Sequence, residues 1–168
     1  KRGATLVVID PRRTPMVDHA TLWLQPTPGT DIYIFLAMAH VILREGWADM
    51  DFVHARTEGF DAFAAALEEY TPDVAALHSG VPAPLIEQAA HAYALGLRAS
   101  ALGEADPIFN LDSSPLSRGA SSILYAMGIT QRTNGTDLVL SLANLAMLGG
   151  QVGRHATGVN PLRGQSNV

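Results

Sequence analysis

The sequence contains no cysteine, which excludes disulfides, thiolate metal sites and a cysteine nucleophile within this chain. Charged residues are also few, at 16% against 48% hydrophobic residues, and this balance excludes disordered and collagen-like classes of protein. Lys1 is the only lysine, so arginine carries almost all of the positive charge. The net charge of −5 argues against a nucleic-acid-binding surface. No apolar run is long enough to span a membrane.

The two ends of the sequence are unlike those of a complete protein. The chain begins with Lys1-Arg2-Gly3, with no initiating Met and no signal peptide, and it ends in a polar loop. We therefore expect a segment of a larger protein. The absence of cysteine gives no information on the cellular compartment. With no signal region present, we expect a cytoplasmic location.

The pattern of apolar residues predicts a single α/β domain over residues 1–168, because 168 residues suffice for one sizeable core. The run from Ala4 to Ile9 is rich in β-branched residues and predicts a strand buried on both faces of a parallel sheet. Further strands are expected at 19–25 and 121–126, and helices at 32–45, 49–57, 60–70, 71–78, 82–95 and from about 137 to 148. The predicted fold is therefore a parallel sheet flanked by helices.

Polar residues of the kind that bind ligands follow three predicted strands, at Asp10–Arg13, Gly29–Asp31 and Met127–Gln131. In a parallel sheet all three segments fall on one edge, where open α/β folds bind their ligands. A helix beginning near Asp31 offers N–H groups to an anion, and a free carboxylate there can accept from a base such as guanine. The alternatives are structural: a proline-punctuated turn at Asp10–Arg13, a plain helix cap at Thr30 and a core gap-filler at Met127.

The closing segment 149–168 holds five glycines, two arginines and a histidine. Glycine allows a close approach to a ligand, and arginine offers a planar fork of donors to phosphate or carboxylate. Composition alone fits a ligand-directed loop and a disordered tail equally well. On α/β topology the loop starts at the opposite edge of the sheet and has to return to the ligand edge.

Five motifs, in order along the chain, resemble the catalytic subunit of molybdopterin-dependent formate dehydrogenases. These enzymes belong to the bis-molybdopterin guanine dinucleotide oxidoreductases, with the nitrate and dimethyl sulfoxide reductases. The motifs are Val8–Thr14, Pro28–Asp31, Arg56–Phe60, Met127–Asp137 and Gly158–Val168. The resemblance implies a Rossmann-like cofactor-binding domain, and it marks residues 102–120 as an inserted loop.

The resemblance also implies roles for individual residues. The guanosine and phosphate part of one pterin dinucleotide would be held by Ile9, Asp10, Arg12, Arg13, Gly29, Thr30 and Asp31. Met127, Gly128 and Gln131 would contact the cofactor nearer its pterin end. Arg163 would lie beside the metal and the substrate carboxylate as the catalytic residue, with Gln165 at the pterin, which agrees with arginine as a clamp for a small carboxylate.

The reaction implied is the oxidation of formate to CO2 at molybdenum or tungsten, with electrons passing to an iron–sulfur cluster and to partner electron-transfer subunits. The cluster cysteines, the Cys or selenocysteine that ligates the metal, and the first nucleotide half have no counterpart in this chain, so no residue here is assigned to the metal. We expect the isolated chain to be inactive and its closing loop to be poorly ordered. The alternatives are a sister nitrate or dimethyl sulfoxide reductase, a stand-alone nucleotide-binding module, or a structural module with a disordered tail after Gly153.

Overall fold

The computed structural model describes residues 4–95, 119–162 and 164. Two of its strands, β1 (Val7–Ile9) and β2 (Leu22–Leu24), pair in parallel with Val7 opposite Leu22 and Ile9 opposite Leu24. A short 3-10 helix, η1 (Pro15–His19), lies between them in the chain. The predicted strands are thus confirmed, but shorter than expected. β1 is only half-buried, not buried on both faces, because it has a single hydrogen-bonded neighbour among the described residues.

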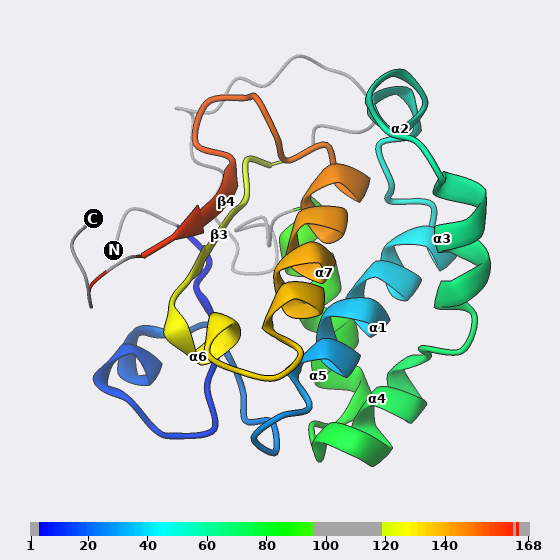
Figure 1. Ribbon diagram of the computed structural model, residues 1–168. Coiled ribbons are helices and arrows are strands. Elements are labelled where there is room, and N and C mark those ends of the chain that lie inside the picture. The colour runs from blue at the N-terminus through cyan, green and yellow to red at the C-terminus, as the bar shows by residue number, and fades with distance from the viewer. Residues whose placement is uncertain (1–3, 96–118, 163, 165–168) are drawn as a thin grey trace, which may run out of the picture.

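A second parallel pair is formed by β3 (Ser122–Tyr125) and β4 (Gly158–Pro161), with Ser122 opposite Gly158 and Tyr125 opposite Pro161. The parallel direction is as predicted. The described strands form two sheets of two strands each, however, and not one continuous sheet. Figure 1 shows both pairs on the side of the molecule away from helices α3 and α4.

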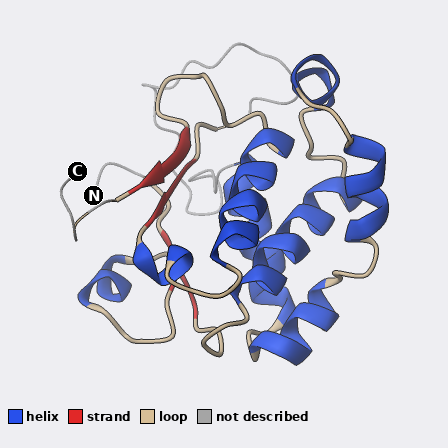
Figure 2. Cartoon of the chain, in the orientation of Figure 1, coloured by secondary structure: helices blue, strands red, loops and turns tan. Residues whose placement is uncertain are grey.

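The helices follow the prediction closely. They are α1 (Asp31–Arg44), α2 (Met50–Arg56), α3 (Phe60–Leu67), α4 (Pro72–Ser79), α5 (Ala83–Leu95) and α7 (Gly135–Leu148). Thr71 caps the start of α4, since its hydroxyl accepts a hydrogen bond from the Val74 N–H at 3.3 Å. Helix α1 packs against α3, α4, α5 and α7, so it is the centre of the helical side (Figure 2).

The hydrophobic core has a larger and a smaller part. Apolar residues that recur at helical spacing in α1 and α7 are buried: Phe35, Met38, Ala39, Ile42, Leu138, Leu142, Leu145 and Leu148. The larger cluster joins α1 to α4, α5 and the end of α7, and the smaller one contains Phe35, Leu138 and Leu142. Ile9 and Ile123 pack against both clusters, so each strand pair is anchored to the helices through an isoleucine.

The closing segment returns to the sheet, as its topology required. After α7 the chain turns at Gly149 and Gly150, runs through residues 151–157 and pairs with β3 as β4. A disordered tail after Gly153 is therefore wrong, and so is poor order for residues 149–162, because β4 gains ladder hydrogen bonds from β3. Arg163 and Gln165 lie outside the described residues, as do residues 102–118 of the predicted insertion.

Candidate functional site

The three polar segments predicted to share one edge each adjoin the smaller core cluster, and a side-chain contact joins the second segment to Arg132, next to the third. Ile9 at the end of β1, Ile32 in the first turn of α1 and Ile129 after β3 all pack against the smaller core cluster. The third segment is not an extended strand end but a short helix, α6 (Met127–Thr130). Gly135 allows this arrangement, because a Cβ there would overlap the carbonyl group of Thr130. The carboxyl end of β1, the start of α1 and α6 therefore border one site.

The most distinctive contact of this site joins Asp31 to Arg132. Asp31 is the first residue of α1 and is only 6% exposed, although it carries a carboxylate. The Arg132 Nη1 atom lies 3.2 Å from its Oδ2 atom. The Nε of Arg132 also donates to the Gly128 carbonyl at 2.7 Å, so the guanidinium is tied to α6. Arg132 thus connects the second polar segment, which follows β2, to the third, which follows β3.

The Asp31 carboxylate is paired by charge but is not saturated with hydrogen bonds. Its Oδ2 atom is buried and has no hydrogen-bond partner, because the nearby Nη1 group is within ion-pair distance without being aligned as a donor. Burying a carboxylate is costly unless it is paired and hydrogen-bonded. Arg132 offsets part of that cost, and the Oδ2 acceptor, which is closed off from solvent, is left without a hydrogen bond.

The backbone around Asp31 leaves room for a ligand. Gly29 has a φ of +100° and is exposed, so the chain turns sharply in front of α1. Thr30 occupies the cap position, but its hydroxyl donates to the Thr27 carbonyl at 2.7 Å and does not cap the helix. The structural alternative for Thr30, a plain side-chain cap of α1, is therefore wrong. The first N–H groups of this 14-residue helix have no side-chain cap, and they carry the positive end of its dipole.

The segment after β1 is arranged as a turn with one strongly exposed guanidinium. The Asp10 Oδ1 atom accepts from the Arg12 N–H at 2.7 Å, so this carboxylate shapes its own loop. Arg13 donates to Asp18 at 2.6 Å and lies 5.9 Å from the centroid of the Trp23 ring. The Arg12 side chain is 83% exposed, with only a 3.7 Å contact to Asp10. Arg12 is the cation of this loop that is best placed for an anionic ligand.

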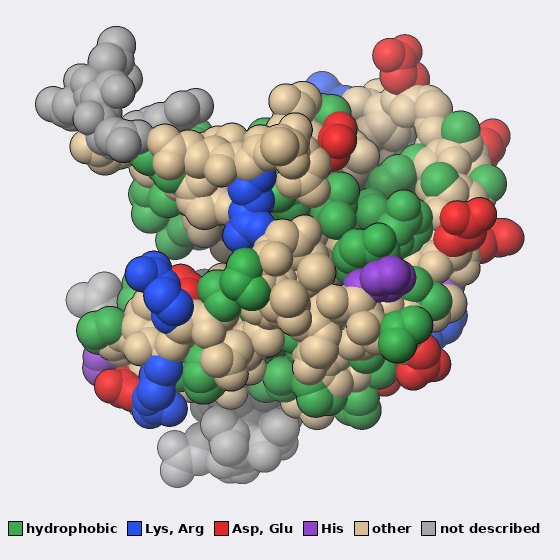
Figure 3. Space-filling model, turned by 60° about the horizontal axis from the view of Figure 1, so that its bottom comes forward, with side chains coloured by type: hydrophobic (Ala, Val, Ile, Leu, Met, Phe, Trp, Pro, Cys, Tyr) green, Lys and Arg blue, Asp and Glu red, His purple; other side chains and the backbone are tan. Residues whose placement is uncertain are grey.

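The space-filling view in Figure 3 is turned so that this edge comes toward the viewer. Arginine side chains border a hollow on this face. Arg12 and Arg13 are strongly exposed, and Arg132 is 23% exposed. Each of them is within ion-pair distance of an aspartate (Asp10, Asp18 and Asp31 in turn), so this edge offers guanidinium donors without an excess of positive charge. Such a distribution suits a ligand that carries phosphate groups.

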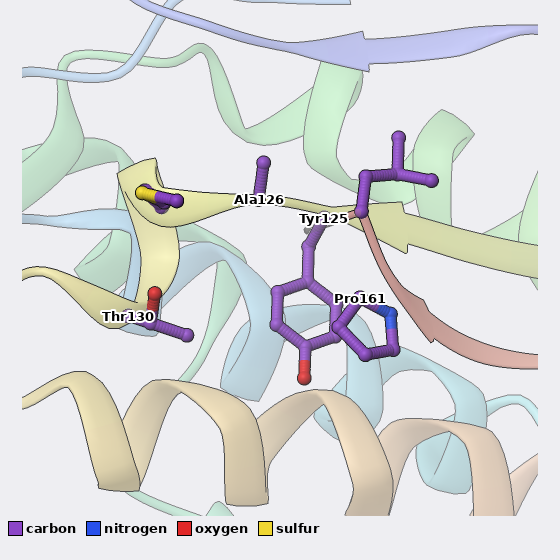
Figure 4. A pocket seen from close by; sticks show the side chains of 6 residues that line it. Tyr125, Ala126, Thr130 and Pro161 are labelled. Atoms are coloured by element: carbon purple, nitrogen blue, oxygen red, sulfur yellow. The ribbon is translucent and has the colours of Figure 1, made fainter. Parts of the chain in front are cut away.

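The other border of the site is formed by α6 and the end of β4. Met127 and Thr130 line a small cavity of about 10 Å³ together with Tyr125, Ala126, Pro161 and Leu162. Figure 4 shows the Tyr125 ring beside the Pro161 ring, above a helix, with Ala126 on the opposite side. The Leu162 N–H donates to the Tyr125 carbonyl at 2.7 Å. This bond fixes the end of β4 beside α6, so the chain reaches Leu162 at the same small cavity as Met127.

A separate hollow of about 230 Å³ lies at the far end of α7, lined by Val53, Thr57, Glu58, Gly59, Phe60, Phe63, Asn144, Met147 and Leu148. It contains four residues of the Arg56–Phe60 motif and none of the predicted site residues. Among the described residues, no group of three or more His, Cys, Asp or Glu side chains could hold a metal ion. None of the helices described is long and apolar enough to cross a membrane.

Arg132 is the residue that sequence reasoning missed. It stands next to Gln131 in a segment already predicted to bind a ligand, and it is one of few cations in the chain. Its proximity to Asp31, which lies about a hundred positions earlier in the sequence, depends on how α6 packs against α7. The sequence feature that could have identified Arg132 is that it stands as an isolated arginine within a run of small polar residues.

Comparison with known proteins places these features in a family. A family model described as molybdopterin oxidoreductase matches residues 1–167. The F420-dependent formate dehydrogenase 1 subunit alpha of Methanococcus maripaludis is 42% identical over 168 residues, which are 100% of this chain and 22% of that protein. Formate dehydrogenase H of Escherichia coli is 37% identical over 168 residues, covering 100% of this chain and 20% of that protein.

A solved structure has the same fold. Acetylene hydratase from Pelobacter acetylenicus matches with a TM-score of 0.76 and 28% identity, over 92% of this chain and 18% of that chain. This chain spans about a fifth of the length of each of these three proteins.

Proposed function

The chain belongs to the molybdopterin oxidoreductase family, and on that premise we propose that the edge formed by β1, α1 and α6 binds a guanine dinucleotide half of the pterin cofactor. The observation that carries this proposal is the buried Asp31 carboxylate. Its Oδ2 atom lacks a hydrogen bond, although it lies at the start of a helix and beside an exposed glycine. Guanine carries two adjacent N–H donors, from which a carboxylate can accept hydrogen bonds. The residues present at this edge therefore fit a guanine base.

The diphosphate is assigned to the cations and N–H groups around Asp31. Gly29 and Thr30 lead into the uncapped N-terminus of α1, where N–H groups and the helix dipole favour an anion. Arg12 supplies an exposed guanidinium, and Arg13 lies next to it in the same loop. In this proposal Ile9 and Asp10 shape the wall and the turn from which these arginines extend.

The pterin end of the cofactor is assigned to Met127, Gly128 and Gln131. This assignment is supported by the position of β4, which ends beside α6. Arg163 and Gln165 follow directly in the sequence, and their roles as the formate-orienting residue and a pterin contact rest on the resemblance of the closing motif. An arginine fork suits a carboxylate the size of formate, because it can donate two parallel hydrogen bonds.

The parent reaction that we propose is the two-electron oxidation of formate, which loses a proton and two electrons to give CO2. When bound, the molybdenum or tungsten of the bis-molybdopterin guanine dinucleotide supplies the redox chemistry. The electrons would leave through an iron–sulfur cluster and partner subunits that bind elsewhere in a longer protein. Formate is favoured over nitrate or dimethyl sulfoxide, because the relatives at 42% and 37% identity are formate dehydrogenases.

Guanine-nucleotide binding tests the proposed site directly. Titration calorimetry of the 168-residue chain should show that GDP binds at least about tenfold more tightly than ADP, a difference of about 1.4 kcal/mol. Asp31→Asn keeps the shape of the side chain and should abolish this preference. Asp137→Asn, which changes an exposed acid in the first turn of α7, is the matched control and should preserve it. Equal affinity for the two nucleotides would refute the proposed site.

Formate-dependent dye reduction tests the proposed reaction. A longer protein that contains this chain, loaded with its cofactor, should reduce a dye with formate and should lose this activity in Arg163→Met. The 168-residue chain alone should stay at the level of buffer, because it has no cysteine to ligate the metal. Activity with nitrate and not with formate would favour the sister-reductase alternative.

A further inference from the structure

Arg132 has no role in the cofactor contacts proposed above, yet it is the residue that connects them. Its guanidinium lies within 3.2 Å of the Asp31 carboxylate, and its Nε is held by the Gly128 carbonyl. A Cβ at Gly29 would be 3.6 Å from its Nη1 atom. The same group thus adjoins the turn before α1, the first residue of α1 and helix α6. A side chain held in this way is pre-organised, since it has little rotamer freedom left to lose on binding.

The donors and acceptors of the pair form a defined pattern. Asp31 offers acceptor oxygens, one of them without a hydrogen bond. Arg132 offers donors beside it: Nε and Nη1 face Gly128 and Asp31, while no described residue pairs with its Nη2 group. The Arg132 side chain is 23% exposed, so a ligand can reach it. A site of this kind selects a molecule that presents an acceptor next to donors.

The Watson–Crick edge of guanine has that order of groups: the O6 acceptor, then the N1–H and N2–H donors. Adenine has a donor at position 6 and an acceptor at N1. Its N6 amine would therefore place a donor against the donors of the guanidinium. Resting on the guanine site proposed above, we propose that Arg132 donates to guanine O6 and is thereby a base-specificity residue. Asp31 accepts from N1–H and N2–H, so the pair reads the whole edge.

A role for Arg132 in phosphate binding is the main alternative, and the geometry disfavours it. Asp31 neutralises much of the charge of Arg132, and the guanidinium is tied down at Nε. Arg12 has an 83% exposed side chain and only a 3.7 Å contact with Asp10. A phosphate gains more from a free, fully exposed guanidinium than from one already paired with a carboxylate. The exposed loop after β1 is therefore the phosphate side, and Arg132 belongs to the base.

The test removes the proposed hydrogen bond between Arg132 and O6 in two ways, by changing the protein or by changing the ligand. It asks whether the two changes lower the binding affinity independently. The affinities of GMP and of 2-aminopurine ribonucleoside monophosphate, which lacks O6 and also the N1 proton that faces Asp31, are measured by calorimetry with the wild-type chain and with Arg132→Met. We expect Arg132→Met to weaken GMP binding by about tenfold, as for the loss of a charged hydrogen bond. Binding of the 2-aminopurine nucleotide should change by less than about twofold, since no O6 is present to lose the bond.

Two further arms separate base contact from other roles. Guanosine, which has no phosphate, should show the same penalty as GMP in Arg132→Met; a penalty present with GMP alone would assign Arg132 to phosphate and overturn the inference. IMP lacks the N2 amine, so the ratio of GMP to IMP affinity should stay unchanged in Arg132→Met, and it should collapse in Asp31→Asn.

Arg132→Lys guards against a folding defect in the methionine variant, because it keeps a charge and a donor. Its GMP affinity should fall between those of the wild type and Arg132→Met, with an unaltered thermal unfolding curve. Equal losses for GMP and the 2-aminopurine nucleotide in both variants would show a merely structural role and overturn the inference, while the guanine preference of the wild type would still uphold the proposed function. A wild-type chain that binds no guanine compound would overturn both.

Discussion

At the residue scale, Tyr93 and Asp31 share an unusual property, a buried side-chain oxygen without a hydrogen bond. Both bury a polar oxygen that has no hydrogen bond, and they are the two such side chains in the described part of the chain. Tyr93 lies in α5, is 9% exposed and packs beside Gly149, 3.7 Å from the position of a Cβ there. Asp31 borders the proposed ligand site. Tyr93 lies within the larger core, so its unpaired hydroxyl is a cost to folding without a proposed ligand to offset it.

We expect Tyr93→Phe to stabilise the fold by about 1 kcal/mol at pH 7, because it removes a buried unsatisfied hydroxyl at almost constant shape. Burial raises the pKa of Tyr93 above its ordinary value. The folded state therefore keeps the phenol neutral at pH values where the unfolded chain ionises it, above roughly pH 10. Ionisation of this phenol therefore leaves the free energy of unfolding unchanged below that pH, and it lowers the free energy of unfolding as the pH rises toward the folded pKa.

Urea unfolding at pH 7 and at roughly pH 10.5 checks both statements. The advantage of Tyr93→Phe over the wild type should grow between the two pH values. Tyr70→Phe, which removes a phenol that is only half-buried, is the control. A clear loss of stability in Tyr93→Phe would mean that the hydroxyl donates to a bound water.

Residue types predicted part of the site, but not its pairing. Asp31 could be placed because Pro28-Gly29-Thr30-Asp31 is a turn followed by a helical pattern. The turn at Asp10–Arg13 was foreseen as an alternative to a ligand contact, and the hydrogen bond from the Arg12 N–H gives Asp10 that role. Arg132 could not be paired with Asp31, because no local rule relates two residues that are joined only by the packing of α6, α7 and α1.

At the scale of elements, the junction between α7 and α2 depends on Gly150. Its φ is +62°, and a Cβ there would overlap the Asp49 side chain. Asp49 in turn caps α2 by accepting from the Phe52 N–H at 3.1 Å, and its own N–H donates to the Leu148 carbonyl at 2.8 Å. One glycine thus allows the end of α7 to lie against the start of α2.

Gly150→Ala should destabilise the fold by roughly 2–3 kcal/mol, about 1 from the left-handed backbone and the rest from displacement of the α2 cap. Gly153→Ala is a matched control, because Gly153 also has a positive φ of +74° but nothing lies within 4 Å of its Cβ position. Its cost should be roughly 1 kcal/mol. The two free energies of unfolding, measured in urea, should differ; equal values would show that Asp49 moves away without loss.

Elements with a strong period were predictable, and elements made by tertiary contact were not. The helices were found within a few residues, because their apolar residues recur at helical spacing and Thr71-Pro72 or Gly80 mark their ends. Strand β4, with the sequence Gly-Val-Asn-Pro, has no strand pattern of its own and exists because β3 offers it an open edge. Helix α6 was expected as an extended strand end because its four residues are too few to show a period.

At the scale of the whole molecule, the proposed site lies on the less extensively packed part of the core. The larger cluster joins α1, α4, α5 and the end of α7, while the smaller one has three buried members, Phe35, Leu138 and Leu142. Strands β3 and β4 are short and partly exposed. Binding edges are commonly drawn from such regions, because local opening there costs less than global unfolding.

Hydrogen exchange should resolve this difference and locate the ligand. In the free chain, amides of α5 and the middle of α1 should exchange most slowly, and those of β3, β4 and α6 at least about tenfold faster, a difference of about 1.4 kcal/mol in opening free energy. GDP in excess should slow exchange at Gly29–Tyr33 and in α6, which open locally, while ADP at the same concentration should have a much smaller effect. Amides of α2, which lies beside the hollow at the far end of α7, should respond only through the global stabilisation that any bound ligand provides. Protection by GDP centred on the hollow between α2 and α7 would instead place the nucleotide at the opposite end of the molecule, and the edge of β1, α1 and α6 would lose its proposed function.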